Sequence, residues 1–326
     1  PVALKFLRRE CLEQPEVVAR FAREAKAAVY VKSEYSAQVF DVGTSDAYGP
    51  YIVMELIDGA DLDTVLGTTG PLPIRRAVEY VLQACEALAV AHSAGILHRD
   101  IKPANLVLTC RSDGTESVKL VDFGVSKSSL GGVAFAGVAP LNETQTLVGS
   151  PMYMAPEQIR RGACDVRTDI WSLGLVLYEA LTGQPAFLAG SITEICALIL
   201  EAPPLPPAVL RPELPAELDR VVMRCLEKDP QARFAHIGEL AVALLPFAPS
   251  RCRLSMDRIA SVLRSSGAML PLTTPGSSAP PPALSGPRIP LPPAPRLPSL
   301  SASLAPASGS ATPSSRGRIT VRTGIP

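Results

Sequence analysis

Apolar residues recur every three to four positions along several stretches of this chain, a period that predicts amphipathic helices. The stretches are residues 16–31, 74–94, 170–181, 215–226 and 236–245. Residues 170–181 are apolar almost throughout, which predicts a buried central helix rather than a surface helix. Gly95 and Gly183 follow two of these stretches and are placed to end the helices.

Three shorter apolar stretches near the start of the chain predict β-strands. They are residues 2–7, 39–42 and 51–56, with turn-forming residues between the second and the third. With the helix at 16–31 they make a small β-rich lobe over residues 1–57. The helices that follow make a larger lobe over residues 58–247, so the predicted fold class is α+β with two lobes.

The composition changes after Phe247. No aromatic residue follows it, and Pro, Ser and Ala dominate residues 248–326. Such a segment buries too little apolar surface to offset the chain entropy lost on folding, so we predict a disordered tail. Its proline runs and scattered arginines leave three uses open: a plain spacer, a proline-rich docking segment, or a linker close to a membrane.

Composition and charge exclude several function classes. The 31 Lys and Arg residues balance the 31 Asp and Glu residues, so nothing indicates a general binder of nucleic acid or of anionic membranes. No apolar run reaches about 18 residues, so no membrane span is predicted. The seven cysteines form no Cys-x-x-Cys pair, which indicates free thiols in a reducing compartment. His92, His98 and His236 lack neighbouring metal ligands, so we predict no zinc site.

One set of polar residues carries the candidate chemistry. Asp100 is followed five residues later by Asn105, and Asp122 begins an Asp-Phe-Gly motif further along the chain. A carboxylate, an amide and a second carboxylate in this order can orient an attacking hydroxyl and hold Mg²⁺ against phosphates. They indicate transfer of a phosphoryl group from ATP to a hydroxyl.

The stretch His98-Arg99-Asp100-Ile101-Lys102-Pro103-Ala104-Asn105 and the Asp-Phe-Gly motif together resemble the eukaryotic-like, bacterial serine/threonine protein kinases. The resemblance covers residues 1–247 and implies the two-lobed protein-kinase-like fold. It implies that Asp100 and Lys102 are catalytic, since the carboxylate would orient the substrate hydroxyl and the ammonium would neutralise charge on the γ-phosphate. A lysine at that position is typical of kinases that act on Ser and Thr.

The same resemblance implies a binding site for ATP and Mg²⁺. Asn105 and Asp122 would bind the metal. Lys5, in a Val-Ala-Leu-Lys strand, would hold the α- and β-phosphates and pair with Glu24 on the next helix. The adenine would be contacted by a gatekeeper side chain and by backbone groups beside it, at Met54, Glu55 and Ile57.

Further motifs correspond to the regulatory and substrate-binding parts of that family. Residues 149–157 end in Ala-Pro-Glu and resemble the end of the activation segment, with Ser150 where a Thr is usual. Arg99 would bind a phosphate on this segment. We therefore predict autophosphorylation at Thr144, at Thr146 or at both.

Two structural roles follow from the same motifs. Glu157 is expected to form a buried ion pair with Arg233. Asp169 is expected to brace the catalytic loop by accepting hydrogen bonds from its backbone N–H groups.

The glycine-rich phosphate loop of this family has no counterpart before Lys5, because the chain opens at Pro1 within a strand pattern. We expect the small lobe to lack its first strands and the sequence to be truncated at its N-terminus. A catalytically impaired kinase or a pseudokinase scaffold is therefore the alternative function. Phosphorylation of a small molecule is disfavoured, since residues 149–157 resemble a platform for a peptide.

The expected partners are proteins that present Ser or Thr, with self-association of the chain during autophosphorylation. Nucleic acid is not an expected partner. The expected location is the cytoplasm, and a membrane tether through a segment outside this sequence stays open.

Overall fold

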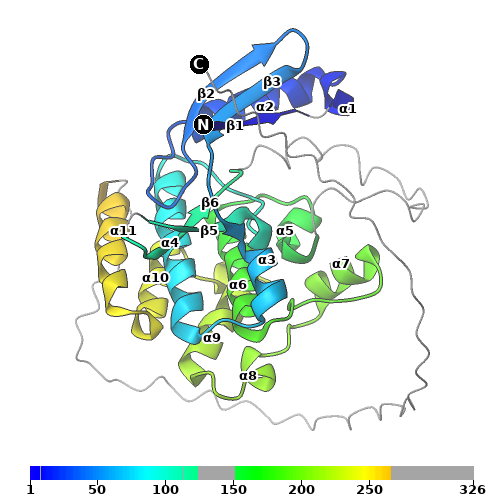
Figure 1. Cartoon of the computed structure of the whole chain (residues 1–326). Helices are drawn as coiled ribbons and strands as arrows, with labels where there is room; N and C mark the ends of the chain where they lie inside the picture. The colour runs from blue at the N-terminus through cyan, green and yellow to red at the C-terminus, as the bar shows by residue number, and fades with distance from the viewer. Residues whose placement is uncertain (8, 112, 124–150, 266–326) are drawn as a thin grey trace, which may run out of the picture. The chain divides into compact units, whose positions relative to one another are not determined.

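The computed structural model describes residues 1–7, 9–111, 113–123 and 151–265, all of which fall within one compact unit. These residues have the α+β class expected from the sequence. A small lobe is built on a β-sheet, and a larger lobe is mainly helical (Figure 1).

The small lobe contains a three-stranded antiparallel sheet in the order β1-β3-β2. Its strands are β1 (Val2–Phe6), β2 (Val39–Ser45) and β3 (Gly49–Glu55). The prediction of three strands in this lobe is confirmed. The register places Lys5 opposite Ile52 and Val2 opposite Glu55. Lys5 is thereby fixed one strand away from the residues expected to contact adenine.

One helix packs against this sheet. The short α1 (Arg9–Leu12) leads into α2 (Pro15–Ala28), which has a proline in its first turn. The buried residues of α2 are those of the predicted apolar face: Val17, Phe21, Ala25 and Ala28. Phe21 and Ile52 belong to a small core that lies between α2 and the sheet. Each large apolar side chain buried there contributes about 1.5–3 kcal/mol.

The large lobe holds the remaining described helices. They are α3 (Leu62–Thr69), α4 (Ile74–Ser93), α5 (Pro156–Ile159), α6 (Val166–Thr182), α7 (Ile192–Glu201), α8 (Pro207–Leu210), α9 (Ala216–Cys225), α10 (Ile237–Leu244) and α11 (Arg253–Ser265). Four of them, α4, α6, α9 and α10, coincide with predicted helices. The sequence pattern did not single out the others.

Short 3-10 helices connect some of these elements. They are η1 (Pro103–Asn105), η2 (Pro151–Tyr153), η3 (Pro230–Ala232), η4 (Leu245–Phe247) and η5 (Ser250–Cys252). The first of them carries the end of the catalytic motif, so Asn105 is held in a tight turn.

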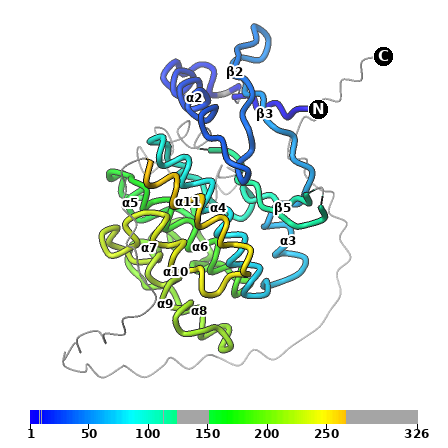
Figure 2. Tube along the Cα trace, turned by 90° about the vertical axis from the view of Figure 1, so that its left-hand side faces the viewer, coloured from blue at the N-terminus to red at the C-terminus, as the bar shows by residue number. Residues whose placement is uncertain are grey.

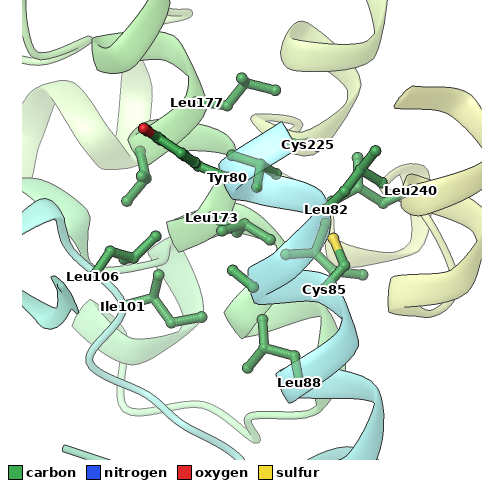
Figure 3. Packing of buried hydrophobic residues seen from close by; sticks show 14 of the residues in the cluster. Tyr80, Leu82, Cys85, Leu88, Ile101, Leu106, Leu173, Leu177, Cys225 and Leu240 are labelled. Carbon is green, nitrogen blue, oxygen red and sulfur yellow. The ribbon is translucent and has the colours of Figure 1, made fainter. Parts of the chain in front are cut away.

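The core of the large lobe lies around α4 and α6. Figure 3 shows Leu82, Cys85 and Leu88 of α4 among side chains from α6, α9 and α10. The apolar run of α6 is buried on all sides, as predicted. Gly174 permits a close contact between α6 and α9, since a Cβ added there would lie 2.4 Å from the Cβ of Cys225. Gly183, in the left-handed conformation with φ 75°, ends α6 as predicted.

A second three-stranded sheet flanks the catalytic motifs. Its strands are β4 (Ala60–Asp61), β5 (Leu106–Cys110) and β6 (Glu116–Leu120), in the order β4-β5-β6. This sheet was not predicted, because its strands are short and their apolar residues do not alternate over a long stretch. It fixes the ends of two functional segments, since Asn105 precedes β5 and Asp122 follows β6.

The predicted disordered tail is wrong for the residues up to Ser265. Helix α11 buries Met256, Ile259 and Leu263 and packs along α4, as both Figure 1 and Figure 2 show. Its apolar residues recur at helical spacing and offset the chain entropy of this stretch. The rest of the predicted tail, residues 266–326, lies outside the described residues.

No helix among the described residues is long and apolar enough to span a bilayer. All seven cysteines are described, and all are free thiols. Burial raises the pKa of Cys85 and of Cys225, the latter to about 12. These two thiols are therefore neutral core residues.

Candidate active site

The catalytic loop brings three polar residues together between α4 and β5. The side chain of Asp100 is buried, and its Oδ2 lies 2.9 Å from Lys102 Nζ. Asn105 Nδ2 donates to the carbonyl oxygen of Asp100 at 2.7 Å and to its Oδ2 at 3.3 Å. The carboxylate of Asp100 is thus oriented by a cation and an amide, both of which the sequence had placed in the site.

His98 is a buried structural residue of this loop. Its Nε2 lies 3.0 Å from the carbonyl oxygen of Val121, and its Nδ1 accepts from the backbone N–H of Asp100 at 3.3 Å. This pattern requires a neutral ring with its proton on Nε2. Burial lowers the pKa of His98, which favours the same neutral form. His98 therefore links the catalytic loop to the residue before Asp122.

Asp169, at the start of α6, braces the loop as predicted. Its Oδ2 accepts from the backbone N–H of His98 at 2.9 Å, and its Oδ1 accepts from that of Arg99 at 2.8 Å. His92 Nε2 lies 2.8 Å from the same carboxylate. Burial opposes ionisation of Asp169, but these hydrogen bonds and the nearby imidazoles leave its pKa below the ordinary value.

Two site residues hold unusual backbone conformations. Arg99 has φ 61° and Asp122 has φ 64°, both in the left-handed region that non-glycine residues seldom occupy. Each costs of order 1–3 kcal/mol and persists only where the surroundings enforce it. The bond that the Arg99 N–H donates to Asp169 and the bond that the Val121 N–H donates to the Asn105 carbonyl oxygen supply that enforcement.

An ion pair joins the small lobe to the Asp-Phe-Gly motif. Lys5 Nζ lies 2.8 Å from Asp122 Oδ1, with both side chains partly exposed. The sequence analysis had expected Lys5 to pair with Glu24, which is half-buried on α2. That pair stays a prediction, and the ion pair that Lys5 forms in this structure is with Asp122. Two residues expected to contact phosphate and Mg²⁺ are therefore adjacent.

The donor set fits Mg²⁺, which prefers oxygen ligands and retains several waters. Within the described parts of residues 1–123 and 151–265, the Asn105 amide forms its hydrogen bonds through Nδ2, so its oxygen can serve as a cation ligand. Asp122 contributes a carboxylate. Within the described residues no group of three or more His, Cys, Asp or Glu side chains is arranged to hold a metal. Asn105 and Asp122 would therefore supply the protein's ligands to Mg²⁺. Phosphate oxygens and waters would supply the remaining ligands.

The residues expected to contact adenine lie at the end of β3 and just beyond it. Met54 is half-buried and packs on the small core. The side chain of Glu55 bonds Lys119 of β6 at 3.0 Å, and its backbone N–H donates to Gln38 at 2.8 Å. Ile57 follows in the connection to α3. These bonds fix the connection between the two lobes at Glu55.

Sequence comparison decides the family. The family described as "Protein kinase domain" matches residues 1–242. The chain belongs to the protein kinase family. It is 36% identical over 274 residues to serine/threonine-protein kinase PknB of Mycobacterium leprae, and 38% identical over 244 residues to serine/threonine-protein kinase Pkn1 of Myxococcus xanthus. The matches cover 82% and 74% of this chain but only 42% and 34% of those relatives.

Solved structures agree with the family assignment. The crystal structure of the PknI kinase domain from Mycobacterium tuberculosis superposes with a TM-score of 0.58 and is 29% identical. The superposition covers 76% of this chain and 86% of that domain. The described fold is therefore the two-lobed kinase fold.

The buried ion pair expected in the kinase large lobe is confirmed. Arg233 Nη1 and Nη2 each donate to one oxygen of Glu157 at 2.9 Å, and Thr168 donates to the same carboxylate at 2.8 Å. Burial would raise the pKa of Glu157, but the bonds from Arg233 leave it lowered. This pair fixes α5, and with it the Ala-Pro-Glu motif, to the helical core.

Two residues near the site were missed by the sequence analysis. His92 completes the set of donors around Asp169, although it had been considered only as a metal ligand. Gln158 Nε2 donates to the carbonyl oxygen of Arg99 at 3.1 Å and so ties α5 to the catalytic loop. The sequence signal for Gln158 was weak, a polar residue directly after Ala-Pro-Glu.

Some predicted residues lie outside the described part of the chain. They are Thr144, Thr146 and Ser150, together with the glycine of the Asp-Phe-Gly motif. Arg99, the predicted ligand of a phosphate on Thr144 or Thr146, is exposed in the catalytic loop. Its role as a phosphate ligand stays a prediction.

Proposed function

We propose that this chain is a serine/threonine protein kinase that transfers the γ-phosphoryl group of ATP to Ser and Thr hydroxyls of proteins. One juxtaposition carries the proposal. Asp100, held by Lys102 and Asn105, lies in a loop that is hydrogen-bonded through Val121 to the segment bearing Asp122. Catalytic carboxylate and metal-binding carboxylate are thereby fixed in one hydrogen-bonded unit.

Each residue has a defined task in this proposal. Asp100 orients the substrate hydroxyl and accepts its proton, and Lys102 offsets negative charge on the transferred phosphoryl group. Asn105 and Asp122 bind Mg²⁺, which supplies charge neutralisation at the phosphates. Lys5 binds the α- and β-phosphates once it leaves Asp122. The transition state is loose, so this positioning and charge compensation supply most of the catalysis.

The remaining predicted residues complete the nucleotide site and its control. Glu24 would pair with Lys5 in the nucleotide-bound form. Met54, Glu55 and Ile57 would line the adenine edge. Arg99 would bind a phosphate on the activation segment, supported by its exposed position next to the catalytic loop.

Specificity for Ser and Thr is supported by Lys102 and by the names of the bacterial relatives. The partners would be protein substrates and, during autophosphorylation, a second copy of the chain. We propose action in the cytoplasm, where ATP is available and where the free thiols would remain reduced. A tether outside this sequence remains compatible with that location.

Transfer of labelled γ-phosphate from Mg·ATP tests the proposal, with Asp100→Asn as the matched variant. Transfer to the chain itself or to a general Ser/Thr substrate, lost in Asp100→Asn, is the expected result. Calorimetric titration with Mg·ATP provides a second readout. Binding without transfer would favour a pseudokinase scaffold, and absence of both would contradict the proposed activity for this chain.

A further inference from the structure

Helix α11 and the turn before it cover a charged strip on α4 with matching charges. Glu79 and Glu86 lie seven residues apart on one face of α4, and their side chains are nearly buried. Arg251 and Arg258 have the same spacing. Arg251 donates to both oxygens of Glu79 through Nε and Nη2, and Arg258 Nη1 lies 3.3 Å from Glu86. The two segments are therefore matched in charge as well as in apolar packing.

Arg258 also reaches beyond α4. Its Nη1 lies 2.8 Å from Oε2 of Glu34, in the connection between α2 and β2. The other oxygen of Glu34 lies 3.0 Å from Arg111 Nη2, and that guanidinium also donates to the Tyr35 hydroxyl at 2.8 Å. Glu34 is thus held from two sides, by the end of β5 and by α11.

The connection that contains Glu34 is hydrogen-bonded to the strand leading to Asp122. The backbone N–H of Leu120 donates to the carbonyl oxygen of Tyr35 at 2.8 Å, and that of Ala37 donates to the carbonyl oxygen of Leu120 at 2.9 Å. These bonds form an isolated parallel bridge between Ser36 and Leu120. Leu120 lies two residues before Asp122, whose carboxylate pairs with Lys5.

We propose that Arg258 is a positioning residue for the nucleotide site. By holding Glu34, it keeps residues 34–37 paired with Leu120, and this pairing fixes the start of the Asp-Phe-Gly motif. Helix α11 thereby supports the connection between α2 and β2 and, through it, the segment that carries Asp122. The expected effect on nucleotide binding rests on the proposed kinase function. We call the support that Arg258 gives to residues 34–37 the brace, and it does not depend on catalysis.

Arg251 distinguishes this role from plain stabilisation of α11. It forms a bidentate pair with Glu79 of α4, and among the described residues it forms an ion pair with Glu79 alone. Loss of either arginine removes an Arg–Glu pair at the same interface. Only loss of Arg258 removes a contact to Glu34.

Amide hydrogen exchange at Leu120 and Ala37 measures the brace directly, since both N–H groups take part in the pairing. Arg258→Gln is expected to speed exchange at both amides by up to about fivefold, the change expected from losing partly exposed ion pairs. Arg251→Gln should leave both amides unchanged, and Arg258→Lys should restore much of the protection. Equal exchange in Arg258→Gln and the unchanged chain, or equal acceleration in both glutamine variants, would overturn the inference.

Calorimetric titration with Mg·ATP then tests the consequence for the site. Arg258→Gln is expected to weaken binding by about threefold, a coupling of modest size, while Arg251→Gln keeps the affinity of the unchanged chain. An unaltered affinity in Arg258→Gln would overturn the positioning role. Failure of the unchanged chain to bind Mg·ATP would contradict the proposed function instead, and the exchange experiment would still decide whether the brace exists.

Discussion

Lys5 Nζ and Asp122 Oδ1 lie 2.8 Å apart, in an ion pair that links the first strand of the small lobe to the Asp-Phe-Gly motif. In the proposed mechanism the two groups have different tasks, one at the phosphates and one at the metal. Both are partly exposed, so the pair is not locked by burial. Mg·ATP can therefore replace this contact with a contact for each partner.

Removal of the lysine charge tests this exchange of partners. Lys5→Met should weaken Mg·ATP binding by about tenfold or more, since a charge-assisted hydrogen bond contributes about 1.5–3 kcal/mol. Titration calorimetry gives the dissociation constant. Lys26→Met is the matched control, because Lys26 is exposed on α2. The same loss of affinity in both variants would argue against a specific role for Lys5.

The buried pair between Glu157 and Arg233 should dominate the stability of the substrate-binding end of the large lobe. Arg233→Met leaves Glu157 without its cation and is expected to cost about 3–5 kcal/mol of unfolding free energy. Urea denaturation measures this quantity. Arg220→Met removes an exposed pair with Glu217 and should lower the free energy of unfolding by less than about 1 kcal/mol. Similar losses in both variants would contradict the proposed importance of burial.

Two buried carboxylates, Glu157 and Asp169, should make the stability of the protein depend on pH in acid. The pKa values of Glu157 and Asp169 are lowered in the folded protein, from ordinary values of 4.5 and 3.8. A group of this kind stabilises the fold above its unfolded pKa, and that stabilisation is lost as the pH falls through its folded pKa. Glu157→Gln should therefore have a lower free energy of unfolding than the unchanged chain, with the largest difference near neutral pH and a smaller one below about pH 4.5. Melting temperatures of both proteins, measured from pH 7 to pH 3, test this. A difference between them that stays constant with pH would contradict it.

Asp169→Asn should impair catalysis more than it impairs folding. The amide has one acceptor oxygen, and its NH₂ group would face a backbone N–H of His98 or Arg99. The catalytic loop should loosen, and kcat should fall by about tenfold or more with a smaller change in the KM for ATP. Steady-state kinetics measure both. Asp257→Asn, at an exposed position on α11, should change neither constant.

Autophosphorylation is expected at Thr144, at Thr146 or at both. Mass spectrometry of the unchanged chain after incubation with Mg·ATP should detect phosphate there, and Asp100→Asn should carry none. Arg99→Gln should reduce any gain in activity that follows phosphorylation, because the guanidinium is the predicted phosphate ligand. An active preparation without phosphate at either threonine would refute the prediction.

Long apolar periodicity made the main helices predictable. The predicted face of α2 and the nearly continuous apolar run of α6 coincide with the buried residues, since tertiary packing acts on the same period that the sequence displays. The strands β5 and β6 are five residues each and escaped detection. They pair antiparallel with each other, Cys110 opposite Glu116, but neither strand shows an alternation long enough to predict it.

Helix α11 was missed for a different reason. The proline-rich composition beyond it dominated the interpretation of residues 248–326, although Cys252, Met256, Ile259 and Leu263 recur at helical spacing. A window limited to residues 250–265 would have shown an amphipathic period. Composition averaged over a long segment hid a short ordered one.

The site was predictable as far as its motifs extend. The sequence placed Asp100, Lys102 and Asn105 together, and it predicted the contacts of Asp169 and Glu157. It did not predict the contact between Lys5 and Asp122, because relative placement of two lobes depends on packing and on ligands. The roles of His92 and Gln158 likewise follow from residues far away in the chain.

The match to the protein kinase domain family ends at residue 242, but the fold continues to Ser265. A graft of residues 1–242 alone onto another protein would uncover an apolar strip of α4 and leave Glu79 and Glu86 without the arginines that face them. The segment that must be kept together for folding therefore extends beyond residues 1–242 and includes α11. When this domain is joined to another protein, α11 must be kept with it, or the new neighbour must cover the same face of α4.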